Sequence, residues 1–193
     1  FSEVDFGLMS FPAANNFAGG AAACGPYNGA NPVDGIGSER SGAGERCQLF
    51  TKPGAITCPT GAEPGGKLLV GLPVATDQVA QLVKFTDDSC ESGDPQELMP
   101  VGGTPLSGLL QSAYSYIQGQ IPNLGPSCRP INVILITDGE ESCNPAKSAT
   151  QVAADMFNVG FDNGRKIRVY PIGFGGLSAA GQTALQNIAD DGQ

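Results

Sequence analysis

Thr104 and Asp138 carry side-chain oxygens that could bind a metal ion. Thr104 opens the segment Thr-Pro-Leu-Ser-Gly, and Asp138 directly follows the apolar run of residues 131–137. The chain contains no histidine, which excludes Ser/His/Asp and Cys/His nucleophile arrangements and every His-liganded metal site. A divalent ion would therefore need oxygen ligands, which suit magnesium, calcium and manganese.

Other chemistry finds little support in the residues. Gly61 and Gly66-Lys67 match a phosphate-binding loop, but Leu68 replaces its Ser or Thr and a predicted strand follows where a helix belongs. The formal net charge of −9 argues against nucleic acid as a partner. A hydrolase based on carboxylates stays open as an alternative, although no spacing singles out an acid and a base. We predict that the chain is not an enzyme.

The elements that must position Thr104 and Asp138 alternate between strands and helices. Residues 131–137 form a continuous apolar run, which predicts a central strand buried on both faces. The alternation predicts an α/β fold with an open, mostly parallel sheet and helices on both faces. The expected strands are 4–11, 68–74, 131–137 and 167–174. The expected helices are 76–85, a helix that begins at Thr104 as its N-cap with Pro105 at the first helical position, a helix that is opened by Asn144-Pro145 and ends at Gly160, and 179–189, which Ser178 caps.

Glycine and proline are unevenly distributed. Together they make up 43 of 193 residues, and 18 of them lie between residues 12 and 66. We predict a single domain, 1–193, with a loop-rich insertion at 13–66 that contains several of the cysteines. The longest apolar run is far shorter than the roughly 20 residues of a membrane span, so no span is expected in this segment.

The cysteine content indicates an oxidising compartment. Six cysteines occur without any Cys-x-x-Cys pair, which favours disulfides over zinc or redox chemistry. We therefore expect an extracytoplasmic protein, whether secreted, periplasmic or on the cell surface. The candidates for disulfide bonds are Cys24, Cys47, Cys58, Cys90, Cys128 and Cys143.

Two motifs resemble the von Willebrand factor A (vWA) domain family. They are Gly102-Gly103-Thr104-Pro105 and the segment Ile-Leu-Ile-Thr-Asp-Gly that ends at Gly139, with a predicted strand upstream and another downstream. The resemblance covers about residues 4–11 and 68–189 and implies a Rossmann-like fold. It also implies a metal-ion-dependent adhesion site with Thr104 and Asp138 as ligands of Mg²⁺, Ca²⁺ or Mn²⁺, supported by the loop residues Gly102, Gly103, Gly139 and Glu140.

The same resemblance implies a binding function. A carboxylate of a protein or other macromolecular ligand would complete the metal coordination. It further suggests a Cys90–Cys143 bond that joins the two site loops, with Cys24, Cys47 and Cys58 stapling the insertion. A Cys128–Cys143 bond is not expected, because a seven-residue strand of about 23 Å would separate the two residues.

The family pattern is expected to be incomplete at both ends, because its last strand and final helix have no counterpart here and its first motif is also missing. No Asp-x-Ser-x-Ser occurs in the chain, so the strand that carries it belongs to a longer chain, comes from another chain, or has been lost with the metal site. The alternative function is therefore a metal-free scaffold or filament subunit, in which the fold and the cysteine-rich insertion make contacts with other subunits of a surface assembly.

Overall fold

The protein divides into two compact units. The first comprises Phe1–Ala13, Ile56–Pro73 and Val101–Gln193, and the second comprises Ala14–Ala55 and Val74–Pro100. The computed structural model describes residues 6–10, 23–25, 46–48, 65–72, 78–83, 104–120, 129–143, 145–161 and 164–193. In the second unit, β2 (Ala23–Gly25) and β3 (Arg46–Gln48) form an antiparallel pair in which Cys24 lies opposite Cys47, and α1 spans Gln78–Val83.

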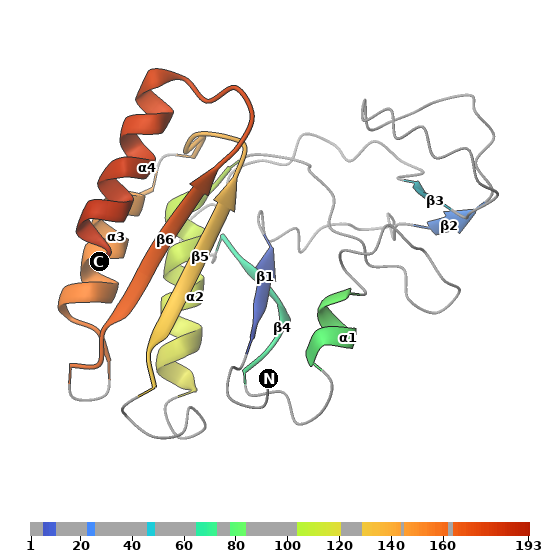
Figure 1. The fold of residues 1–193 in the computed structure, drawn as a ribbon, viewed down its shortest axis with the longest axis horizontal. Helices are drawn as coiled ribbons and strands as arrows, with labels where there is room; N and C mark the ends of the chain where they lie inside the picture. The colour runs from blue at the N-terminus through green and yellow to red at the C-terminus, as the bar shows by residue number, and fades with distance from the viewer. Residues whose placement is uncertain are drawn as a thin grey trace. The chain divides into compact units, whose positions relative to one another are not determined.

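The described residues of the first unit form two small sheets, each of two strands. β1 (Leu8–Ser10) pairs with β4 (Lys67–Val70) in antiparallel orientation. β5 (Ile131–Thr137) pairs with β6 (Ile167–Gly173) in parallel, so that the carboxyl ends of both strands lie at one edge, as Figure 1 shows. The mixed α/β class and a parallel pair are thus present, and the predicted bounds of strand 131–137 are confirmed.

The described part of the first unit also contains three helices. They are α2 (Leu106–Gly119), α3 (Ala149–Asn158) and α4 (Ala179–Asp191). Alternate residues of β5 and β6 contribute Leu135, Ile167 and Val169 to the core, which these helices complete with leucine, valine and methionine side chains. Among the described residues, no helix is long and apolar enough to cross a membrane.

The core lies on one face of the parallel pair. Leu135 is buried, whereas Ile134 is 63% exposed, Ile136 is 55% exposed and Ile172 is 50% exposed. The prediction of a strand buried on both faces, with helices on both faces of the sheet, is therefore wrong for the part of the first unit that the structure describes. Successive side chains of a strand point to opposite faces, and the packed helices cover only the face of Leu135.

The helix starts differ from two predictions. α2 begins at Leu106 rather than Thr104, and its N-cap residue is Pro105. α3 begins at Ala149 rather than at Asn144-Pro145, because Ser148 and Gln151 form a capping box in which each side chain accepts from the other's backbone N–H. The predicted cap of α4 by Ser178 is confirmed, as is the turn at Gly160, where φ is +60°.

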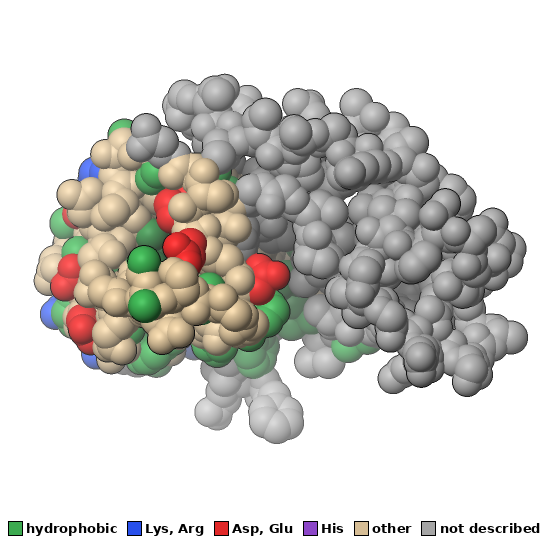
Figure 2. All heavy atoms as spheres, turned by 90° about the horizontal axis from the view of Figure 1, so that it is seen from above, with side chains coloured by type: hydrophobic (Ala, Val, Ile, Leu, Met, Phe, Trp, Pro, Cys, Tyr) green, Lys and Arg blue, Asp and Glu red, His purple; other side chains and the backbone are tan. Residues whose placement is uncertain are grey.

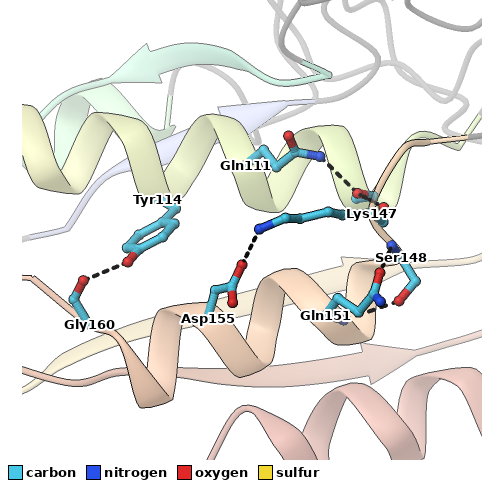
Figure 3. Close-up of polar contacts among 8 residues, drawn as sticks. Gln111, Tyr114, Lys147, Ser148, Gln151, Asp155 and Gly160 are labelled. Carbon is cyan, nitrogen blue, oxygen red and sulfur yellow. Dashed lines mark hydrogen bonds and ion pairs between the residues drawn. The ribbon is translucent and has the colours of Figure 1, made fainter.

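Polar contacts fix α2 between its neighbours. On one side, the backbone N–H of Gly66 donates to Ser112 Oγ at 3.1 Å, and that of Leu72 donates to the Tyr116 hydroxyl at 2.5 Å. On the other side, the Tyr114 hydroxyl donates to the carbonyl of Gly160, beyond the end of α3, at 2.6 Å (Figure 3). These contacts join the middle and second half of α2 to the segment around β4 and to the residue beyond α3.

Candidate functional site

The loop that follows β5 lies against the residues that precede α2. The backbone N–H of Ser142 donates to the Thr104 carbonyl at 3.1 Å, and the backbone N–H of Thr104 donates to Ser142 Oγ at 2.5 Å. The Thr104 hydroxyl oxygen lies 2.8 Å from the point where a β-carbon on Gly139 would stand. The structure therefore brings the Thr104 and Asp138 segments together, as the sequence predicts.

The turn after β5 places Asp138 in solvent. The Thr137 hydroxyl donates to the Gly139 carbonyl at 2.9 Å and accepts from the Gly139 N–H at 3.1 Å. This local bonding by a threonine side chain closes a turn over Asp138. The Asp138 side chain is exposed, and among the described residues it has no hydrogen-bond or ion-pair partner. Its carboxylate is thus available to a ligand.

Thr104 does not cap α2. The capping oxygen of a helix accepts from the N–H groups of its first turn, but the N-cap residue here is Pro105 and makes no side-chain cap. Instead, Glu141 Oε2 accepts from the backbone N–H of Ser107 at 2.8 Å. Among the described residues, the Thr104 hydroxyl has no hydrogen-bond partner, and the side chain faces Gly139.

Glu140 lies at the start of α4. A β-carbon on Gly181 would stand 2.6 Å from Glu140 Cγ, so the acidic side chain packs on the first turn of that helix. The positive end of the helix dipole favours a carboxylate there. Glu140 is exposed and lies on the side of the loop that faces α4. The next residue, Glu141, points toward α2.

The site carries a net negative charge. Asp138, Glu140 and Glu141 all lie in the loop after β5, and Lys147 pairs with Asp155 at 2.6 Å along α3 (Figure 3). Figure 2 looks down on the edge to which β5 and β6 point in Figure 1, and acidic side chains lie across this face. An excess of carboxylates raises the local concentration of cations.

The donor set fits a hard cation in part. Asp138 offers a carboxylate and Thr104 a hydroxyl, which are ligand types that Mg²⁺ and Ca²⁺ accept. Within the described ranges, no group of three or more His, Cys, Asp or Glu side chains is placed to hold a metal ion. A cation bound by Thr104 and Asp138 would therefore need further oxygens from water or from a partner.

The sequence identified some site residues and missed others. Gly139 and Glu140 lie in the site loop, whereas Gly102 and Gly103 fall outside the described residues. Glu141, Ser142 and Ser107 were missed, because their bonds join positions 34 or more residues apart and leave no local pattern.

The disulfide prediction is tested at one position. Cys143 is disulfide-bonded, so the loop that carries Asp138 is cross-linked, as expected. The proposed partner Cys90 lies outside the described residues, as do Cys58 and Cys128.

Comparison with protein-family models, with curated proteins and with solved structures finds no match to this chain.

Proposed function

We propose that the chain is an extracytoplasmic binding domain, similar to vWA domains, that recognises a macromolecular ligand through a divalent cation at Thr104 and Asp138. The observation that carries this proposal is the freedom of both donors. The Thr104 hydroxyl is not used as a helix cap, and the Asp138 carboxylate has no partner among the described residues. Both belong to segments that touch at Gly139.

Each residue has a distinct task in this proposal. Asp138 supplies the negative charge that attracts the cation, and Thr104 supplies a neutral oxygen from the opposite segment. Gly139 leaves room for the Thr104 side chain. When bound, Mg²⁺, Ca²⁺ or Mn²⁺ would accept a carboxylate of the ligand as a further oxygen donor. An open α/β sheet also binds ligands outside the carboxyl ends of its strands, where this loop lies.

Binding rather than catalysis suits the chain. Histidine is absent from the sequence, which removes the general base of the Ser/His/Asp and Cys/His arrangements. The disulfide at Cys143 supports an oxidising, extracytoplasmic location.

A second function is favoured by a different observation. The face of β5 and β6 opposite the core exposes a group of large apolar side chains, namely Ile134, Ile136, Tyr170 and Ile172. Contiguous exposed apolar patches are typical of protein–protein contacts. This face supports the alternative of a metal-free scaffold or filament subunit.

Calorimetric titration with Mg²⁺, Ca²⁺ and Mn²⁺ distinguishes the two functions. The cation-dependent function predicts binding that Asp138→Ala abolishes, that Thr104→Val weakens and that Thr104→Ser largely retains. Asp191→Ala is the matched control, because it removes an exposed carboxylate at the last residue of α4. Absence of binding in the unaltered chain, with self-association that Ile134→Ser weakens, would favour the scaffold instead.

A further inference from the structure

The first turn of α2 receives its cap from a distant loop. The first N–H groups of a helix have no partner within the helix, and a local Ser, Thr, Asp or Asn usually accepts from one of them. Pro105 has no oxygen in its side chain, and the backbone N–H of Ser107 donates to Glu141 Oε2. Glu141 therefore does for α2 what a local capping residue normally does.

Glu141 also organises its own loop. Its second oxygen, Oε1, accepts from the backbone N–H of Cys143 at 3.1 Å. The Ser107 hydroxyl in turn donates to the carbonyl of Lys147 at 2.6 Å and accepts from Gln111 Nε2 at 3.0 Å. The loop after β5 is thus tied to the start of α2 through both its middle and its end.

The bond from Ser107 to Glu141 affects the orientation of the Thr104 hydroxyl. Thr104 lies three residues before Ser107, the spacing at which a threonine hydroxyl at a helix start accepts a cap bond from a backbone N–H. While Glu141 holds the Ser107 N–H, the Thr104 hydroxyl faces Gly139 instead. Each carboxylate oxygen of Glu141 accepts one backbone N–H group, so the bonds present in the structure give Glu141 a structural role.

We propose that Glu141 is a positioning residue for the ion site, because its carboxylate caps α2 from the loop and thereby leaves the Thr104 hydroxyl directed toward the Asp138 segment. This inference rests on the proposed function, and it adds a residue that the motif resemblance does not contain. Glu141 acts through Thr104 and makes no contact with the ion. Its loss should therefore weaken ion binding without removing a ligand.

The test compares Glu141→Ala with Tyr114→Phe on the full chain. Tyr114→Phe removes the hydrogen bond to Gly160, which lies just beyond the C-terminal end of α3. Like Glu141→Ala, it removes a hydrogen bond between α2 and a distant segment, but it lies away from the ion site. Mn²⁺ affinity is measured by calorimetry at a temperature at which all variants are folded. Hydrogen exchange of the Ser107 amide is measured on the same samples.

Glu141→Ala is expected to weaken Mn²⁺ binding about tenfold, the smaller end of the effect of residues that orient metal ligands, and to speed exchange of the Ser107 amide. Tyr114→Phe should change neither quantity. Glu141→Gln keeps one carbonyl acceptor and should fall between Glu141→Ala and the unaltered chain.

Different failures have different meanings. If Glu141→Ala leaves either the affinity or the Ser107 exchange unchanged while the unaltered chain binds Mn²⁺, the role of Glu141 is overturned and the proposed function stands. If Tyr114→Phe weakens binding as much as Glu141→Ala, the effect is general destabilisation, and the positioning role is likewise overturned. An unaltered chain that binds no divalent ion overturns the proposed function together with that role.

Discussion

Thr104 and Gly139 lie so close that a β-carbon at position 139 would stand 2.8 Å from the Thr104 hydroxyl oxygen. This contact joins the segment before α2 to the loop after β5. A side chain at position 139 would therefore have to displace the Thr104 side chain, so the constraint on Gly139 comes from space rather than from backbone conformation.

Gly139→Ala is the direct test of this contact. The added methyl group must displace Thr104, which should lower the free energy of unfolding by roughly 1 kcal/mol and weaken ion binding. Gly119→Ala is the control, since a β-carbon there meets nothing within 4 Å and should stabilise α2 by about 0.5 kcal/mol. Urea unfolding measures both. A Gly139→Ala variant as stable as the unaltered chain, with unchanged ion affinity, would show that Thr104 does not lie against Gly139.

The one-sided core predicts opposite outcomes for neighbouring residues of β5. Leu135 is 1% exposed and Ile134 is 63% exposed. Leu135→Ala should lower the free energy of unfolding by about 3 kcal/mol, whereas Ile134→Ala should change it by no more than about 0.5 kcal/mol. Equal losses for the two variants would mean that the outer face is covered as well.

Tyr114 predicts a loss of stability in alkaline solution. Burial, with the nearby Asp155 carboxylate as a smaller cause, raises the pKa of Tyr114 above its ordinary value of 10.0. The folded state therefore holds this proton at a pH at which the unfolded chain has released it, so stability is present below pH 10 and falls as the pH rises further. Tyr114→Phe should flatten this fall in urea unfolding measured between pH 8 and pH 11. An identical pH dependence in the variant would contradict the role of Tyr114.

The second unit offers a prediction about disulfides. Cys24 and Cys47 are opposite each other in the antiparallel pair of β2 and β3. The Cα atoms of such pairs are about 4.5 to 5.5 Å apart, within the range that a disulfide spans. Peptide mapping without reduction should recover Cys24 joined to Cys47. Recovery of either cysteine joined to Cys128 would contradict both the strand pairing and the expected stapling of the insertion.

The sequence predicts the local features of the fold best. The bounds of β5, the cap at Ser178 and the turn at Gly160 follow from neighbouring residues alone, and all three are confirmed. The predicted start of α2 at Thr104 is wrong, because the first turn is capped by Glu141, which lies 34 residues away from Ser107 in the sequence. The burial of β5 was wrong because a continuous apolar run specifies a strand but not how many of its faces are packed.

The candidate site shows the same division. Thr104 and Asp138 could be named because each lies at a recognisable boundary. Thr104 precedes a helix, and Asp138 follows a strand. The hydrogen bonds of Ser142 to Thr104 and of Ser107 to Glu141 depend on how α2 packs beside β5. No spacing within either segment encodes that packing, so these residues emerge only from the folded structure.

Paramagnetic broadening by Mn²⁺ tests the central claim most directly. In two-dimensional amide NMR spectra of the full chain, substoichiometric Mn²⁺ should broaden the signals of Thr104, Asp138 and Gly139 first, and Mg²⁺ in excess should restore them. Asp138→Ala should lose this selective broadening. Broadening that is absent, or that is centred on exposed carboxylates elsewhere such as Asp190 and Asp191, would contradict a divalent-cation site at Thr104 and Asp138.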